Sequence, residues 1–207
     1  MDVFIVDHPV AAVRLATMRD ETTRPAGFRQ ALHELSRLLV YEATGDLPTE
    51  AFEVQTPLGP AEAERLDQSP LLAPVLRAGL GMLGAAQEVL PESQVGFIGL
   101  RRNEETLEPD SYLTTVPDDL GGRPVLVLDP MLATGGSAEH ACRIVREAGA
   151  GPIILVCVLA APEGIEALET TGLVDQVYTA AVDSHLDETA FIVPGLGDAG
   201  DRQFGIQ

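Results

Sequence analysis

An apolar run, an acid and a pair of glycines follow one another in VLVLDPMLATGGS, Val125 to Ser137. Four aliphatic residues lead directly into Asp129, and five residues later the chain reaches Thr-Gly-Gly-Ser. A short, continuous apolar run bounded by turn residues is typical of a strand that is buried on both faces of a parallel sheet. The glycine pair then predicts a tight turn into the next element.

The same pattern recurs along the chain. Apolar runs of strand length alternate with helical segments such as GLGMLGAAQEVL, which indicates an α/β fold with a parallel sheet covered by helices on both faces. We also expect two N-terminal helices (9–19 and 26–44), a hairpin around residues 51–66, and an irregular segment over the last 17 residues. The predicted strands are residues 71–76, 95–100, 124–129, 153–161 and 176–182.

Length and charge limit the possible functions. With 207 residues, of which 45% are hydrophobic, the chain is expected to form one domain around one core. It carries 32 acids against 13 bases, and every base is arginine. The lack of lysine excludes a Walker A phosphate loop and Schiff-base chemistry, and the net charge of −19 argues against nucleic acid as a main partner. So acidic a composition indicates either adaptation to high salt or the residue usage of a GC-rich genome.

Membrane and metal signals are weak. The longest apolar run, Ile153 to Ala161, is far shorter than the roughly 20 residues that span a bilayer. The start, MDVFIVDHPV, does not resemble a secretory signal, so we expect a cytoplasmic protein without a membrane partner. Cys142 and Cys157 are interpreted as small buried hydrophobic residues, and no histidine is assigned to a metal.

Charged residues follow three of the predicted strands. Arg77 follows LLAPVL, Arg101 and Arg102 follow VGFIGL, and Asp129 follows PVLVL. Because ligands of open α/β sheets bind beyond the carboxyl ends of the strands, these residues predict a small positive site for an anionic ligand.

The segment from Asp129 to Ser137 can hold two ends of one ligand. A carboxylate at a strand end can accept hydrogen bonds from a vicinal diol such as ribose, and the amides at the start of the following helix can bind a phosphate. For the Thr-Gly-Gly-Ser segment taken alone, an ordinary loop with a helix cap is the alternative.

VLVLDPMLATGGS resembles the motif that binds 5-phosphoribosyl 1-diphosphate (PRPP) in type I phosphoribosyltransferases, most closely in the uracil phosphoribosyltransferase family. Other segments resemble that family in its order along nearly the whole chain: YEATGDL (41–47), VLRAGLGM (75–82), RNEETLEP (102–109), AAPEGIEALE (160–169) and VPGLGDAGDRQFG (193–205). The resemblance implies one domain of the type I phosphoribosyltransferase fold, with N-terminal helices over about 1–50, a core over about 67–183 and a base-binding hood over about 184–207.

The resemblance also implies an activity. It is the transfer of a phosphoribosyl group from PRPP to uracil, which gives UMP and diphosphate in pyrimidine salvage, by a pentosyltransferase that uses Mg²⁺. A homodimer or homotetramer and GTP as an effector are further implications. The alternatives are a pyrimidine-operon regulator that binds RNA and keeps residual activity, for which a basic face would be needed, and a catalytically silent PRPP sensor.

Site residues are carried over by position. PRPP contacts fall on Arg77, Arg102, Asp198 and the run Asp129, Pro130, Met131, Leu132, Ala133, Thr134, Gly135, Gly136 and Ser137. Uracil contacts fall on Ile192, Gly197, Asp198 and Ala199, and the catalytic candidates are Arg77, Arg102, Asp129 and Asp198. No direct metal ligand is assigned, although Asp198 is a candidate to contact Mg²⁺ through water or PRPP. The alternative for Asp198 is a loop acid that caps a turn.

Two features depart from the family or superfamily pattern. Many type I members have two adjacent acids where this chain has Asp129-Pro130, a proline that the uracil enzymes share. The lysine-free segment TTRPAGFR (22–29) differs from a region that usually bears lysine, which bears on effector binding and subunit packing. Residues 102–112, RNEETLEPDSY, are interpreted as a lid over PRPP, with a solvated hairpin as the alternative.

Overall fold

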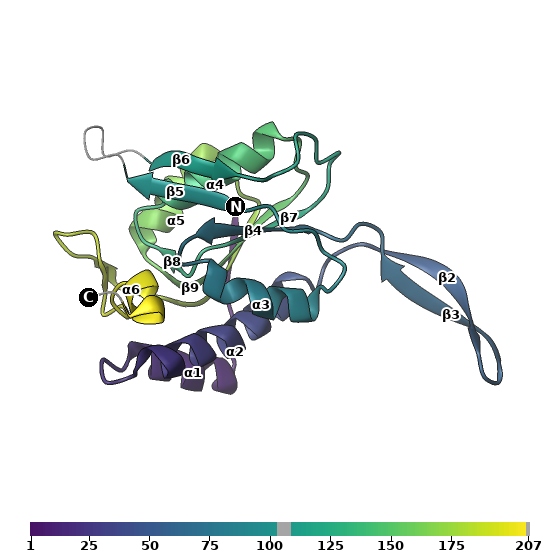
Figure 1. The fold of residues 1–207 in the computed structure, drawn as a ribbon, viewed down its shortest axis with the longest axis horizontal. Helices are drawn as coiled ribbons and strands as arrows, with labels where there is room; N and C mark the ends of the chain where they lie inside the picture. Colours follow the sequence, from purple (N-terminus) through teal and green to yellow (C-terminus); the bar gives the residue numbers. More distant parts are fainter. Residues whose placement is uncertain (103–108, 206–207) are drawn as a thin grey trace.

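The computed structural model describes residues 1–102 and 109–205, which build an eight-stranded central sheet (Figure 1). Its strands are β1 (Asp2–Ile5), β4 (Leu71–Leu76), β5 (Ile98–Arg102), β6 (Pro109–Thr114), β7 (Val125–Leu128), β8 (Met131–Leu132), β9 (Ile153–Ala160) and β10 (Gln176–Val182). The order is β1-β10-β9-β7-β4-β5-β6, and β8 pairs with β9. Every pair is parallel except β5–β6, so the predicted α/β fold is confirmed.

Helices cover both faces of this sheet, as Figure 1 shows. One face packs against α1 (Pro9–Arg19), α2 (Pro25–Ala43) and α3 (Leu80–Val89), and the other against α4 (Gly136–Glu147) and α5 (Pro162–Thr171). None of the helices in the described ranges is long and apolar enough to cross a membrane.

The alternation of side chains along each strand explains this arrangement. Leu126 and Leu128 of β7 lie in the core under α1, α2 and α3, while Val125 and Val127 lie in the core under α4. Successive strand residues point to opposite faces of a sheet, so a continuous aliphatic run supplies both cores at once. Cys142 and Cys157 are buried in the second core, as expected, and burial raises the pKa of each thiol to about 12.

The predicted hairpin is a separate arm. Strands β2 (Thr49–Thr56) and β3 (Gly59–Leu66) pair only with each other and project away from the sheet (Figure 1). Thr56 closes the turn, because its Oγ1 accepts hydrogen bonds from the amides of Leu58 and Gly59 at 3.2 Å each. The Leu58 side chain at the tip is 100% exposed.

Several short elements were not predicted. An edge strand, β1, starts the chain, and all four of its residues are exposed, so it lacks the buried pattern of the inner strands. β6 runs antiparallel to β5 at the opposite edge. The last 17 residues are not wholly irregular, because they contain β12 (Ile192–Val193), which pairs with β11 (His185–Leu186), and the short helix α6 (Ala199–Phe204).

Candidate active site

The carboxyl ends of β4, β5 and β7 border a cavity of about 330 Å³. Arg77, Asp129 and Asp198 line it together, although they come from three distant parts of the sequence. Of the predicted PRPP run, the residues that line this cavity are Asp129, Met131, Leu132, Ala133, Thr134, Gly135 and Ser137. The structure therefore gathers most of the predicted PRPP residues at the expected end of the sheet.

Arg77 lies in the turn between β4 and α3. The Leu76–Arg77 peptide bond is cis, and the Gly79 amide donates to the Val75 carbonyl at 2.8 Å. A Cβ on Gly79 would lie 2.2 Å from the Leu128 carbonyl oxygen, so only glycine allows this turn to approach β7 so closely. The approach places the arginine beside the strand that ends at Asp129.

Asp129 lies on the floor of the cavity, immediately after β7. Its amide donates to the Val156 carbonyl at 3.2 Å, which extends the pairing of β7 with β9, and its Oδ1 accepts from the Met131 amide at 3.4 Å. The carboxyl group is only partly open to solvent. This loss of water raises its pKa to about 7, and the single long hydrogen bond from Met131 offsets little of the increase.

The following segment is held against β9 and α5. The Pro130 carbonyl accepts from the amides of Val158 and Leu159 at 2.9 and 3.1 Å. A Cβ on Gly164 in α5 would lie 2.3 Å from the Ala133 carbonyl oxygen, so α5 packs directly on this turn. Pro130 lines neither this cavity nor its neighbour, which indicates that it fixes the turn from behind.

The turn ends at the start of α4. Gly135 has φ +87°, a left-handed conformation that favours glycine, and helix α4 begins at the next residue. The first amides of a 12-residue helix therefore lie at the cavity wall that Thr134, Gly135 and Ser137 form. Such amides, together with the helix dipole, favour an anion at this position.

A second cavity of about 460 Å³ adjoins the first. The four residues predicted to contact uracil, Ile192, Gly197, Asp198 and Ala199, all line it. The two cavities share a wall that consists of Leu100, Met131, Ala133, Thr134, Ser137, Asp198 and Ala199. The arrangement is a two-part site, in which one part adjoins the helix terminus and the other adjoins the glycine-rich segment.

Asp198 belongs to both parts. Its Oδ1 accepts from the Asp201 amide at 2.8 Å and so caps α6, while the residue also lines both cavities. The residue thus caps a helix and lines both cavities at the same time. Two carboxylates, Asp129 and Asp198, line the first cavity. Within the described ranges, no cluster of three or more His, Cys, Asp or Glu residues could hold a metal ion.

Sequence reasoning missed part of the second cavity. Thr189, Ala190 and Phe191 line it as well, together with Arg101, which was expected at the end of its strand. Ala190 has φ +66°, and the Asp187 carboxylate holds this turn by accepting from the amides of Thr189 and Phe191 at 2.8 and 2.9 Å. Asp187-Glu188-Thr189 is a sequence typical of a turn, and it comes shortly before Ile192. It does not follow one of the predicted strands, so the rule that ligands bind at strand ends does not point to it.

The two parts are joined through a buried glutamine. Gln203 of α6 donates from Nε2 to the carbonyl oxygens of Ala78 and Ala199, at 3.0 and 2.9 Å. Ala78 follows Arg77, and Ala199 lines both cavities. The turn that carries Arg77 is therefore fixed to the segment that borders the second cavity.

Two predictions fall outside this description. The side chain of Arg102 and residues 103–108 of the predicted lid are not among the described residues.

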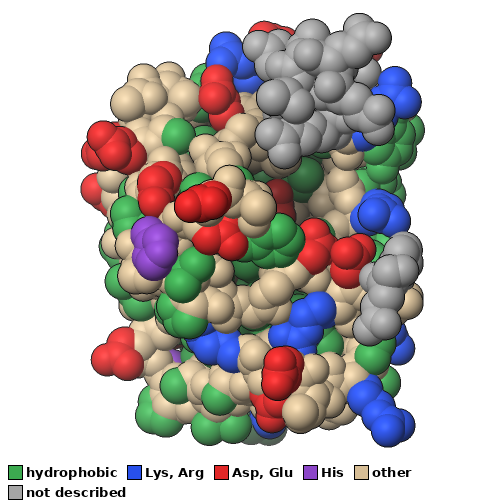
Figure 2. Space-filling view, turned by 90° about the vertical axis from the view of Figure 1, so that its left-hand side faces the viewer, with side chains coloured by type: hydrophobic (Ala, Val, Ile, Leu, Met, Phe, Trp, Pro, Cys, Tyr) green, Lys and Arg blue, Asp and Glu red, His purple; other side chains and the backbone are tan. Residues whose placement is uncertain are grey.

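On the face shown in Figure 2, acidic side chains are spread among the arginines of the described residues, as the net charge of −19 suggests.

Comparisons with known proteins agree with this geometry. The family model for uracil phosphoribosyltransferase matches residues 5–206. The uracil phosphoribosyltransferase of Corynebacterium efficiens is 51% identical over 205 residues, which cover 99% of this chain and 97% of that protein. A solved structure of the AQ2163 protein from Aquifex aeolicus has a TM-score of 0.93 and 38% identity, and the match covers 99% of both chains. A hypoxanthine-guanine phosphoribosyltransferase from Bacillus anthracis shares the fold at 13% identity, with a TM-score of 0.51 over 74% of this chain and 78% of that one.

Proposed function

Because the chain belongs to the uracil phosphoribosyltransferase family, we propose that it transfers the phosphoribosyl group of PRPP to uracil. In this reaction N1 of uracil forms a bond to C1 of the ribose, and the bond from C1 to the diphosphate oxygen breaks. The N1 proton is released, and the products are UMP and diphosphate. The observation that carries the proposal is the two-part site, in which an acid and a helix terminus share a cavity with Arg77 and adjoin a glycine-rich pocket.

The first cavity supports a role in holding PRPP. Asp129 would accept hydrogen bonds from the two ribose hydroxyls, and the amides at the start of α4 would bind the 5'-phosphate. Arg77 would bind the diphosphate and neutralise the charge that grows on it as the bond to C1 breaks. Most of the rate enhancement then comes from holding the reactants in line and stabilising the leaving group.

The second cavity supports a role in reading the base. Uracil presents an acceptor, a donor and an acceptor along one edge, whereas cytosine presents an acceptor, an acceptor and a donor. The small residues from Gly197 to Ala199 leave backbone groups accessible at this cavity. If the wrong base leaves a polar group of such a site unpaired, kcat/KM for that base can fall by about 10⁴-fold.

The residues of the first cavity fit Mg²⁺. This ion is usually held by phosphate oxygens, water and one or two carboxylates, and Asp129 and Asp198 line the same cavity. Asp198 is the residue that would hold it, directly or through water. The ion would supply positive charge to the diphosphate. A cytoplasmic location and a GTP effector remain predictions.

The proposal is tested by incubating the purified protein with labelled uracil, PRPP and Mg²⁺, with cytosine, orotate and hypoxanthine as competing bases. We expect UMP to form and the other bases to compete poorly, because their edges do not match the same backbone groups. Failure to form UMP, or preference for another base, would contradict the proposed function.

We also propose that the arm of β2 and β3 packs against a second copy of the chain. A two-stranded hairpin is at best marginally stable alone in water, and this one ends in the fully exposed Leu58, with Phe52 also exposed. An apolar groove, which Leu38, Tyr41, Leu47, Leu66, Val89 and Leu90 line, lies at its base. Both features favour the homodimer or homotetramer that the resemblance implies.

Replacing Leu58 and Phe52 together with aspartate should therefore reduce the mass in solution to that of one 21.9 kDa chain. The reason is that two charges would be placed in an apolar contact. Size-exclusion chromatography with light scattering measures the mass, and Val13→Asp, at an exposed position on α1, serves as the control that keeps the wild-type value. A monomeric wild type, or a double variant of unchanged mass, would refute the role of the arm.

A further inference from the structure

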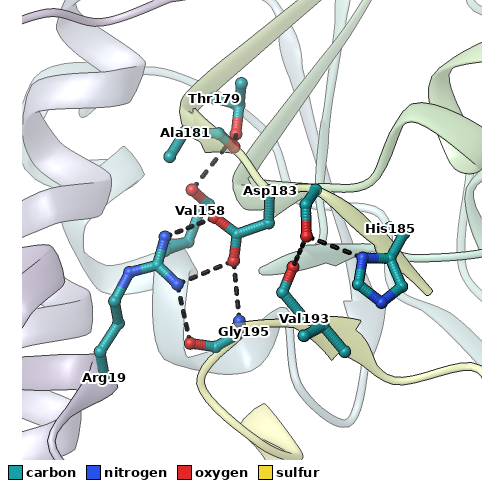
Figure 3. Close-up of polar contacts among 9 residues, drawn as sticks. Arg19, Val158, Thr179, Ala181, Asp183, His185, Val193 and Gly195 are labelled. Atoms are coloured by element: carbon teal, nitrogen blue, oxygen red, sulfur yellow. Dashed lines mark hydrogen bonds and ion pairs between the residues drawn. The ribbon is translucent and has the colours of Figure 1, made fainter. Parts of the chain in front are cut away.

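We infer that Arg19 and Asp183 are positioning residues for uracil recognition, because their ion pair binds both backbone polar groups of Gly195. The two residues are 164 positions apart in the sequence. Arg19 is the last residue of α1, and Asp183 immediately follows β10. Figure 3 shows that they meet beside Gly195.

The contacts form a closed set. The Arg19 guanidinium donates to Asp183 Oδ1 at 2.6 Å and to Oδ2 at 2.7 Å, and Nη1 also donates to the Gly195 carbonyl at 2.8 Å. The Gly195 amide in turn donates to Asp183 Oδ2 at 2.8 Å (Figure 3). One glycine is thereby held at both its amide and its carbonyl by a single ion pair.

Gly195 begins the segment that we call the base-reading segment, Gly195 to Ala199, and controls its direction. Gly195 has φ +64°, and a Cβ there would lie 2.0 Å from the carbonyl oxygen of Ile192. Ile192 and Gly197 line the second cavity, whereas Gly195 does not, because it faces α1 on the other side of the loop. Holding Gly195 from behind therefore determines where the backbone of Gly197 to Ala199 is presented.

The ion pair is well shielded. The Asp183 side chain is 6% exposed and that of Arg19 is 26% exposed. Burial opposes ionisation of Asp183, but the Arg19 guanidinium and the Gly195 amide outweigh it and lower the pKa of the carboxyl group. Removing either partner would leave a shielded charge unpaired, which destabilises a protein strongly. Conservative variants are therefore the informative ones.

A second arginine holds the next residue. Arg202 of α6 donates to the carbonyl of Leu196 at 2.9 Å and to that of Asp20 at 2.6 Å, and its guanidinium lies 4.7 Å from the Phe28 ring. The turn after α1 and the base-reading segment are thus joined twice. Arg19 differs from Arg202 because it also pairs with an acid, Asp183, which follows β10.

The inference rests on the proposed function and is tested with Arg19→Lys. Lysine keeps the charge but lacks the planar fork that reaches both carboxylate oxygens and the carbonyl. We expect the KM for uracil to rise about tenfold, which is less than the roughly 10²-fold that a 1 Å misplacement can cost. The KM for PRPP should rise less than the KM for uracil, because Arg77, Asp129 and the start of α4 make none of these contacts and Asp198 is the one PRPP residue in the displaced segment.

Arg146→Lys is the matched control. Arg146 also pairs with an aspartate, Asp175, at 3.1 Å, and donates to the carbonyls of Ala150, Gly151 and Leu173. It lies at the other end of the sheet, where β9 begins. We expect it to reduce thermal stability as Arg19→Lys does, without changing the KM for uracil.

Asp183→Asn is the second variant. It keeps an acceptor for the Gly195 amide and loses the charge, so we expect a larger rise in the KM for uracil and weaker discrimination against cytosine. If both Arg19→Lys and Asp183→Asn reduce stability but leave the uracil KM and base selectivity at wild-type values, the ion pair is structural only and the inference is wrong. Failure of the proposed function is distinguishable, because wild-type protein would then form no UMP.

Discussion

Replacing Asp129 with asparagine is expected to reduce kcat/KM for PRPP by two to three orders of magnitude. Asparagine has nearly the same shape but only one acceptor oxygen and no charge. Two hydrogen bonds from a ribose diol to a carboxylate are worth about 1.5–3 kcal/mol each, so losing the second and weakening the first reduces the rate on the order of 10²- to 10³-fold. The measurement is kcat/KM at saturating uracil and Mg²⁺.

The same variant gives a test that depends on pH. The pKa of Asp129 is raised to about 7 by loss of water, so the carboxyl group is protonated below that pH and cannot accept from both hydroxyls. The ratio of wild-type to variant kcat/KM should rise with pH through about 7 and then level off, because kcat/KM reports ionisations of the free enzyme. Taking the ratio cancels the ionisation of PRPP itself. The measurement should cover about pH 5.5 to 8.5, on either side of this pKa. A ratio that does not change with pH over this range would show that Asp129 does not bind the ribose hydroxyls.

Stability should change in the opposite direction from activity. The pKa in the folded protein lies above the ordinary value of 3.8, so the contribution of this group to stability is full below pH 4 and is lost as the pH rises through about 7. At pH 8 the folded protein holds a shielded negative charge that asparagine lacks. The variant should therefore unfold at a higher temperature than wild type at pH 8. A variant that is both less active and less stable would indicate a structural role instead.

Replacing Arg77 with glutamine is expected to reduce kcat/KM for PRPP by about 10²- to 10³-fold, the size seen when one group that stabilises developing charge is removed. Arg77 is exposed at the cavity and bears a charge that glutamine lacks. Inhibition by the product diphosphate should weaken in parallel, while the KM for uracil should change little. Steady-state kinetics with added diphosphate measure both effects.

Two further variants make the Arg77 result specific. Arg77→Lys keeps the charge without the bidentate fork, so it should recover part of the lost activity. Arg143→Gln removes another exposed arginine, which lies on α4 and pairs with Glu139, and should leave the kinetics unchanged. Unaltered diphosphate inhibition in Arg77→Gln would show that this arginine does not contact the leaving group.

The sheet and half of the site could be predicted because they depend on local patterns. β4, β9 and β10 are aliphatic runs of strand length, and the residue after such a run in a parallel sheet must lie at the ligand-binding edge. Arg77 and Asp129 were found in this way. β1 was missed because it is an exposed edge strand between acids, and α6 because six residues with glycine give no helical period.

The rest of the site depends on contacts between distant residues. Neither the meeting of Arg19 with Asp183 nor that of Gln203 with Ala78 leaves a signal in the sequence, since each joins elements more than a hundred positions apart. The left-handed conformation of Ala190 depends on the Asp187 turn and not on the residue type. The shift of the Asp129 pKa likewise follows from burial, which appears only when β7, β9 and the Arg77 turn are packed together.

The most direct measurement is a crystal structure of the protein with Mg²⁺ and PRPP. The account predicts that both Asp129 carboxylate oxygens contact the ribose hydroxyls, and that the amides at the start of α4 surround the 5'-phosphate. A sugar bound with its hydroxyls away from Asp129, or a phosphate bound away from that helix, would contradict it.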